Sequence, residues 1–132
     1  MNGCILDSYA MIAYLEDENG AAEVERFLDE AEKGKLNARM SIVNWGEVYY
    51  SIFRSKGEEK AEAALIIMEQ LPIKITDVDR DIMYSVAKIK ANHAIALGDC
   101  FAAAEAVKTD YPVITGDKEF RKLGKIIQVK WL

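Results

Sequence analysis

The sequence predicts an α/β fold in which a parallel, doubly wound sheet is covered by helices on both faces. Three short runs rich in β-branched residues, at 4–7, 72–76 and 112–115, each come just before a segment with helical periodicity. Strands that alternate with helices favour a parallel sheet, because each crossover helix packs against one of its faces. With 132 residues, 51% of them apolar, the chain has enough side-chain volume for one core. We therefore expect a single domain over residues 1–132.

The expected sheet has five strands. CILD at 4–7, PIKIT at 72–76 and PVIT at 112–115 are the three runs already described. NARMS at 37–41 and IIQVKWL at 126–132 are two further candidates, and the second of these would be the final strand.

Amphipathic stripes predict the helices between these strands. In each stripe the apolar residues recur at helical spacing, which places them on one side of a helix of about 14 residues. The three stripes are Val24, Phe27, Leu28 and Ala31; Ala61, Ala64, Leu65 and Met68; and Ile82, Val86 and Ile89.

The segment SIVNWGEVYYSIFRS at 41–55 differs because it is apolar nearly all round. A helix of this kind either lies deep in the core or packs one face against a partner chain, and the two readings have about equal weight. In the second reading, helices 20–34 and 44–70 would line the groove for the partner. The candidate partner residues are Trp45, Val48, Tyr49, Ile52, Phe53, Leu65 and Met68.

Four acidic residues are expected to meet at one edge of the sheet. Asp7 ends the first strand, Asp117 follows the strand at 112–115 by one glycine, and Asp99 opens the helix at 97–109. In an open parallel sheet, ligands bind beyond the carboxyl ends of the strands. Glu47 can join these three from the polar side of its helix.

Each aspartate alone is more simply explained as a helix N-cap, because aspartate is among the best capping residues. As a set, however, the four would crowd negative charge into one crevice, which is costly without a cation. Carboxylate ligands suit Mg²⁺ or Mn²⁺. The lone His93 cannot build a zinc site and is better read as a packing residue than as a substrate contact.

The net charge of −5 argues against an ordinary nucleic-acid binder. Residues 1–70 carry 7 basic and 14 acidic side chains, whereas residues 71–132 carry 10 basic and 8 acidic ones. Lys118, Arg121 and Lys122 lie close together in the second part, either as a solvated helix face or as contacts for phosphate groups.

The chain is expected to be cytoplasmic, with no contact to a membrane. Its N-terminus lacks a positively charged leader, and Asp7 interrupts the first apolar run. The two cysteines, Cys4 and Cys100, cannot build a disulfide framework and are interpreted as reduced packing residues.

Four segments together make the chain resemble the PIN-domain nucleases, and among them the prokaryotic toxins called VapC. They are LDSYA at 6–10, VNWGEVYY at 43–50, LGDCFAAAEA at 97–106 and TGDKEF at 115–120, in the order typical of that family. The resemblance implies a sandwich of helices around a five-stranded sheet. It also implies toxin homodimers and inhibition by a cognate antitoxin.

Carried over to this chain, the resemblance makes Asp7, Glu47, Asp99 and Asp117 the residues that bind Mg²⁺ or Mn²⁺ and hydrolyse RNA. The substrate would be single-stranded or looped RNA, and a metal-activated water would leave a 5′-phosphate and a 3′-hydroxyl. Supporting roles fall to Ser8, Thr115 and Glu119, although both hydroxyls could equally be local caps. Tyr9 departs from the family pattern, in which a small residue is usual.

Two other functions are compatible with the same residues. One is a catalytically silent module that binds proteins and whose acids are helix caps. The other is a phosphoaspartyl protein, which DSYA at 7–10 disfavours because it lacks a second aspartate two residues after the first.

Overall fold

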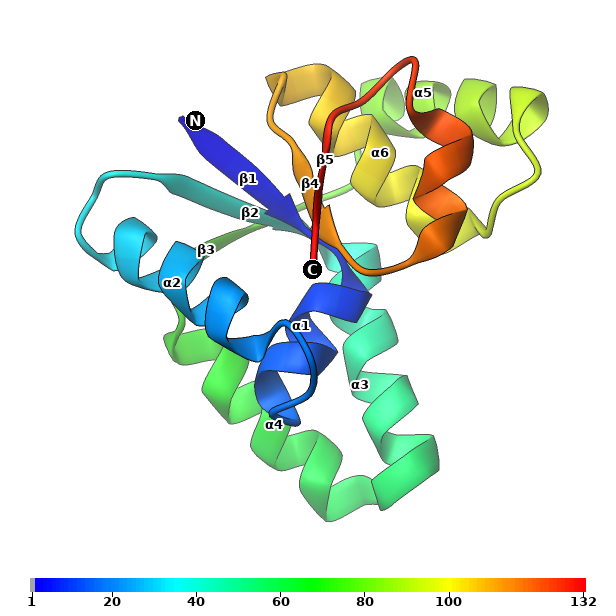
Figure 1. Ribbon diagram of the computed structural model, residues 1–132. Helices are drawn as coiled ribbons and strands as arrows, with labels where there is room; N and C mark the ends of the chain where they lie inside the picture. The colour runs from blue at the N-terminus through cyan, green and yellow to red at the C-terminus, as the bar shows by residue number, and fades with distance from the viewer. Residues whose placement is uncertain (1) are drawn as a thin grey trace.

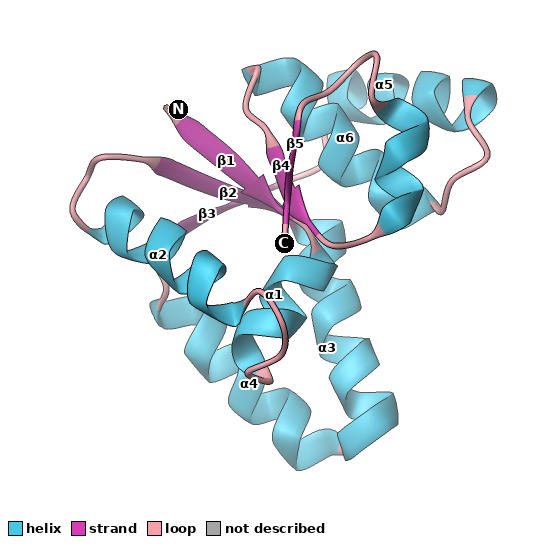
Figure 2. Cartoon of the chain, in the orientation of Figure 1, coloured by secondary structure: helices cyan, strands magenta, loops and turns pink. Residues whose placement is uncertain are grey.

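The computed structural model describes residues 2–132, and a five-stranded sheet forms its centre (Figures 1 and 2). The strand order is β3-β2-β1-β4-β5, and all four pairings are parallel. The predicted α/β fold with a parallel five-stranded sheet is therefore confirmed. The strands are β1 (Gly3–Leu6), β2 (Asn37–Ser41), β3 (Ile73–Thr76), β4 (Val113–Thr115) and β5 (Val129–Trp131).

Helices cover both faces of this sheet. In Figure 1, α1 to α4 lie below it, whereas α5, α6 and the short 3₁₀ helix η1 lie above it. The helices are α1 (Ser8–Leu15), α2 (Ala21–Glu32), α3 (Ile42–Lys56), α4 (Glu58–Gln70), α5 (Arg80–Asn92), α6 (Leu97–Thr109) and η1 (Lys118–Leu123).

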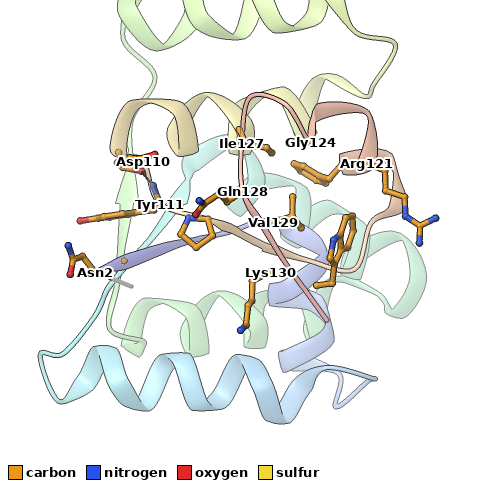
Figure 3. A pocket seen from close by; sticks show the side chains of 14 residues that line it. Asn2, Asp110, Tyr111, Arg121, Gly124, Ile127, Gln128, Val129 and Lys130 are labelled. Carbon is orange, nitrogen blue, oxygen red and sulfur yellow. Dashed lines mark hydrogen bonds between the residues drawn. The ribbon is translucent and has the colours of Figure 1, made fainter.

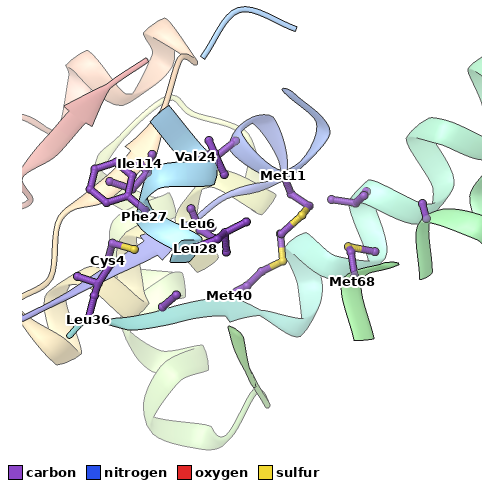
Figure 4. Close-up of a cluster of buried hydrophobic side chains, with 14 of the residues drawn as sticks. Cys4, Leu6, Met11, Val24, Phe27, Leu28, Leu36, Met40, Met68 and Ile114 are labelled. Atoms are coloured by element: carbon purple, nitrogen blue, oxygen red, sulfur yellow. The ribbon is translucent and has the colours of Figure 1, made fainter. Parts of the chain in front are cut away.

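The two faces of the sheet carry separate hydrophobic clusters. Strand β1 is buried along its whole length. Cys4 and Leu6 join the first cluster, between the sheet and α1 to α4, whereas Ile5 joins the second cluster, between the sheet and α5 and α6. Figure 4 shows the first cluster, to which Met11 of α1, Met40 of β2 and Met68 of α4 contribute flexible side chains. This burial on both faces explains why the strands read as continuous apolar runs.

Helix α3 is apolar nearly all round because it contacts both clusters. Val48 lies in the first cluster, and Val43 packs against the second. The helix begins where the Ser41 hydroxyl accepts a hydrogen bond from the Val43 N–H. The expected helix at 44–70 is in fact two helices, because Gly57 has a φ of 95°, which only glycine adopts readily, and ends α3 there.

The candidate partner surface on α3 and α4 is largely internal. Ile52 and Met68 are each only 4% exposed and lie in the first cluster, so they are not available to a partner, and this part of the prediction is wrong. Trp45, Tyr49 and Leu65 are half-buried against the same cluster. Phe53 is 41% exposed and remains a candidate partner contact.

One further detail differs from expectation. The last strand is shorter than the predicted 126–132, since Ile127 turns into the second cluster and only Val129–Trp131 pair with β4.

The remaining residues singled out in the sequence are His93 and the two cysteines. His93 is the C-cap of α5, in an extended conformation, and it is half-buried. Cys4 and Cys100 are buried and free, as predicted. Across residues 2–132, no helix is both long and apolar enough to span a membrane.

Candidate active site

Asp7 lies at the carboxyl end of β1, where it is almost completely buried. It is the N-cap of α1, and its Oδ1 accepts a hydrogen bond of 2.9 Å from the Ala10 N–H. Its Oδ2 accepts a hydrogen bond from the Thr115 hydroxyl on the neighbouring strand β4. Both carboxylate oxygens are therefore engaged, and Asp7 is a helix cap as well as a candidate ligand.

Thr115 connects Asp7 to the loop that carries Asp117. Besides donating to Asp7, its Oγ1 accepts a hydrogen bond of 3.0 Å from the Asp117 N–H. Oδ1 of Asp117 in turn accepts a hydrogen bond of 3.0 Å from the Glu119 N–H at the start of η1. Of the two predicted supporting hydroxyls, Thr115 makes these contacts, whereas that of Ser8 bonds to no described residue.

Asp99 lies in the first turn of α6, but it does not cap that helix. The N-cap position is Ala96, and no side chain bonds to the first-turn N–H groups of α6. Within the described residues, Oδ2 of Asp99 is buried and has no hydrogen-bond partner. A buried carboxylate oxygen without a partner is rare, because it has given up its hydration without compensation.

Glu47 approaches Asp99 from α3 because Gly98 leaves room for its carboxylate. An ideal Cβ built on Gly98 would lie 2.0 Å from Glu47 Oε2, so any side chain there would displace the carboxylate. Asn44 holds this arrangement: its Nδ2 donates to Glu47 Oε1 at 2.7 Å and to the Gly98 carbonyl at 3.0 Å. Sequence reasoning missed Asn44, although its place one helical turn before Glu47 was a usable signal.

Burial and mutual repulsion make the four acids electrostatic neighbours. Burial raises the pKa of Asp7 to about 7. Hydrogen bonds from Thr115 and Ala10 oppose this rise, whereas the charges of Asp99 and Asp117 add to it. Burial and the nearby charges of Asp117 and Glu47 also raise the pKa of Asp99 to about 7. At neutral pH, ionising the whole set is therefore unfavourable unless positive charge is supplied.

The donor atoms of this cluster suit a hard divalent cation. All of these donor atoms are oxygens, which such a cation prefers. Two of them, Asp99 Oδ2 and Asn44 Oδ1, are buried without a hydrogen-bond partner in the part of the chain that the structure describes. As these side chains stand, however, no three Asp, Glu, His or Cys residues within 2–132 are arranged to hold a metal ion. A cation bound there would need the carboxylates to move closer together.

The three basic residues predicted to contact phosphate lie on η1, directly after Asp117. Lys122 is already engaged, since its Nζ donates to the Ala94 carbonyl at 2.9 Å and pairs with Glu119 at 3.2 Å. Arg121 lies 5.9 Å from the centre of the Trp131 ring and lines a different hollow. Lys118 is exposed beside the acids.

That hollow borders the edge strand β5 and is lined by none of the four acids. Figure 3 shows Tyr111, Gln128 and Arg121 around it. A separate groove between α3 and the start of α6 includes Glu47, with Tyr50 and Leu97 among its walls. This second groove adjoins the acidic residues.

Comparisons with known proteins agree with this fold. No protein of curated description matches the chain in sequence. Among solved structures, VapBC2 from Rickettsia felis bound to a promoter DNA fragment has a TM-score of 0.76 at 15% identity, covering 97% of both chains. VapBC from Salmonella typhimurium bound to DNA has a TM-score of 0.74 at 17% identity, covering 98% of both. VapC20 from Mycobacterium tuberculosis, a toxin that cleaves the sarcin-ricin loop, has a TM-score of 0.73 at 15% identity, covering 96% of this chain and 98% of that one.

These likenesses establish the fold, and the family rests on a match of the sequence itself. The model of the PIN domain matches residues 4–126. This stretch contains all four acidic residues of the candidate site, from Asp7 after β1 to Asp117 before η1. The chain therefore belongs to the PIN domain family.

Proposed function

We propose that the chain is a Mg²⁺- or Mn²⁺-dependent endoribonuclease and the toxin of a toxin–antitoxin pair. One observation carries the catalytic part of this proposal: Asp99 brings a buried, unpartnered carboxylate oxygen into a cluster of like charges. A cap or a structural ion pair would leave no such oxygen, whereas a metal ligand would.

The cation would be held by Asp7, Asp99 and Asp117, with Glu47 as a direct or water-mediated ligand. When bound, such an ion activates a water and neutralises charge on the phosphate and on the leaving oxygen. Mg²⁺ prefers oxygen ligands, keeps several waters and binds substrate phosphates, so some of these carboxylates would hold it through water.

The protein's own contribution is to position these acids. Thr115 orients Asp7 and the Asp117 backbone together, and Asn44 fixes the Glu47 carboxylate against the backbone of α6. The hydrogen bond from Thr115 also lowers the pKa of Asp7 and so favours the ionised form that a cation requires. Lys118, on the exposed side of Asp117, is available to an RNA phosphate.

The proposed substrate is single-stranded or looped RNA, because a cluster at a sheet edge accepts a splayed strand more readily than a duplex. The proposed partner is a cognate antitoxin, in line with the VapBC complexes among the similar structures. We place Phe53, with the partly accessible Trp45, Tyr49 and Leu65, in its contact surface. A cytoplasmic homodimer is the proposed form of the free toxin.

One observation favours a second function, that of a catalytically silent binding module. As they stand, the side chains of residues 2–132 offer no ready-made site for a metal ion. A module that has lost catalysis could retain the acids in this separated arrangement. The phosphoaspartyl alternative has less support, since both oxygens of Asp7 already accept hydrogen bonds.

The decisive experiment is cleavage of a labelled single-stranded RNA by the purified chain with Mg²⁺, Mn²⁺ or EDTA. Asp99→Asn is the test variant, and Asp81→Asn, an exposed acid in the first turn of α5, is the matched control. We expect cleavage that requires the metal, is lost in Asp99→Asn and is unchanged in Asp81→Asn. Products with a 2′,3′-cyclic phosphate, or equal cleavage in EDTA, would contradict the proposal. Mn²⁺ binding without cleavage of any RNA would favour the silent module.

A further inference from the structure

Tyr9 places an exposed aromatic ring at the rim of the acidic cluster. It lies in the first turn of α1, two residues after Asp7, and is 45% exposed. Within the described residues its hydroxyl makes no side-chain hydrogen bond, so no polar contact accounts for its position. An exposed ring at this place requires an explanation, because its neighbours Asp7 and Ala10 are both buried.

The explanation begins with Gly116, in the loop between β4 and η1. An ideal Cβ on Gly116 would lie 2.4 Å from Tyr9 Cε1 and 2.6 Å from Cζ, so the outer part of the ring lies directly on the Gly116 backbone. Gly116 has no conformational need to be glycine, since the positive φ angles among the described glycines belong to Gly20, Gly34 and Gly57. The missing side chain at 116 instead leaves room for the ring.

The ring therefore connects the two segments that carry Asp7 and Asp117. Gly116 lies between Thr115, which bonds to Asp7, and Asp117. Contact with this backbone on one side and attachment to the first turn of α1 on the other limit the positions that the ring can take. A ring already restricted in this way loses little conformational entropy when it binds a flat ligand.

The chemistry of the surroundings selects that ligand. Beside Asp7, Asp99 and Asp117, an RNA phosphate is repelled unless a cation accompanies it, whereas a neutral base is not. Every base has a π face that can stack on an aromatic side chain, and such stacking is a common way of holding single-stranded RNA. We infer that Tyr9 stacks on a nucleobase next to the scissile phosphate and so positions the RNA strand in the site. This inference rests on the proposed ribonuclease function.

The test compares two ligands of equal charge. A short fluorescein-labelled oligoadenylate and an abasic ribose-phosphate oligomer of the same length are titrated, in Mg²⁺, with protein that carries Asp99→Asn so that neither is hydrolysed. We expect the base-bearing RNA to bind more tightly, and Tyr9→Ala to lower that preference by about 5- to 150-fold, the range expected for one stacked base. Tyr9→Phe and Tyr9→Trp should retain it.

Two further variants separate stacking from folding. Tyr84→Ala removes a tyrosine that is 68% exposed on α5, outside the site, and should leave the preference unchanged. Gly116→Ala keeps the Tyr9 ring but displaces it, and should reduce the preference as Tyr9→Ala does. Thermal unfolding of each variant verifies that it is folded.

The inference is overturned if the ratio of the two affinities in Tyr9→Ala stays within twofold of the ratio in the parent protein. It is also overturned if the RNA binds no better than the abasic oligomer, or does not bind at all. Wild-type cleavage assays distinguish this failure from failure of the proposed function. If wild-type protein cleaves RNA but the preference does not depend on Tyr9, only the stacking role is wrong. If the preference depends on Tyr9 but wild-type protein never cleaves, the site binds RNA without hydrolysing it.

Discussion

Helices α1 and α6 both begin beside an aspartate, yet the two aspartates are held in opposite ways. Asp7 caps α1, and each of its oxygens accepts a hydrogen bond. Asp99 caps nothing, and its Oδ2 is buried without a partner among the described residues. Burial raises the pKa of both to about 7, but only for Asp7 do hydrogen bonds oppose that rise.

This difference shows how a structural acid can be told from a candidate ligand. The position of an aspartate near a helix N-terminus does not distinguish the two roles, because capping explains it as well as ligation does. The hydrogen-bond partners of each oxygen do distinguish them. By this criterion Asp7 has a structural role in addition to any catalytic one, whereas Asp99 has no structural role that its contacts reveal.

The largest effect that separates the two residues is expected for Asp99→Asn in catalysis. Removing a proposed ligand should lower RNA cleavage by at least about 100-fold, the upper range seen for partners that only support ligands. Because the substitution also removes a buried charge, it should raise the free energy of unfolding at pH 8 in EDTA. Rate assays and urea denaturation measure the two effects. Lower stability together with full activity would mean that Asp99 is structural.

The next largest effect is the pH dependence of stability without metal. The pKa of Asp7 is about 7 in the folded protein, against an ordinary value of 3.8. A carboxyl group whose pKa is higher in the folded state stabilises the fold when it is protonated. That stability is full below the unfolded pKa and is lost as the pH rises through 7. From Asp7 alone we expect the free energy of unfolding to fall by about 2–3 kcal/mol between pH 5 and pH 7.5.

Urea denaturation in EDTA across this pH range measures the fall, and Mn²⁺ should reduce it. Asp99 contributes in the same direction, since its pKa is also raised to about 7. A free energy of unfolding that rises with pH in EDTA would show that the acids are already compensated by the protein itself.

A smaller effect is expected for Asn44→Ala. Without the Asn44 amide, Glu47 loses the hydrogen bond that holds it against Gly98, while Asp7 and Asp99 keep their positions. Loss of a residue that orients a ligand typically costs about 10- to 100-fold in metal affinity. Calorimetric titration with Mn²⁺ measures this. Asn92→Ala is the control, because Asn92 bonds only to the Lys88 carbonyl on the exposed face of α5. Equal affinity for Mn²⁺ in both variants would show that Glu47 does not contribute to metal binding.

The smallest effect is a difference in stability between two alanine variants at pH 5, where both aspartates are protonated. Asp7→Ala removes the cap of α1 and the acceptor for Thr115, so we expect a loss of about 1–2 kcal/mol. Asp99→Ala removes no hydrogen bond to Oδ2 and should cost less than about 0.5 kcal/mol. If Asp99→Ala lowers the free energy of unfolding more than Asp7→Ala does in urea denaturation, the proposed difference between the two aspartates is wrong.

Sequence patterns were sufficient for the features that depend on neighbours along the chain. The alternation of strands and helices predicted the parallel sheet, and the positions of Asp7 and Asp117 just after two strands placed them at one edge. The helix stripes, such as Ile82, Val86 and Ile89, point into the core as their spacing required.

The remaining features depend on contacts between segments far apart in sequence. Nothing near Gly98 or Gly116 indicates that Glu47 and Tyr9 occupy the space above them. The burial of Ile52 and Met68 depends on how α3 packs on α4 and the sheet, which an all-round apolar pattern does not determine. The break at Gly57 and the place of Asn44 one turn before Glu47 were local features that could have been recognised, since glycine ends many helices and residues three apart share a helix face.

The most direct test of the central claim is a crystal structure of the protein soaked in Mn²⁺, with the ion located by its anomalous scattering. The cluster should contain a peak contacted by an Asp99 oxygen and by an oxygen of Asp7 or Asp117, with Asp7 retaining its hydrogen bond to Ala10. A structure in which Mn²⁺ binds elsewhere, or in which Asp99 Oδ2 stays without a ligand at saturating Mn²⁺, would contradict the assignment of these acids as a metal site.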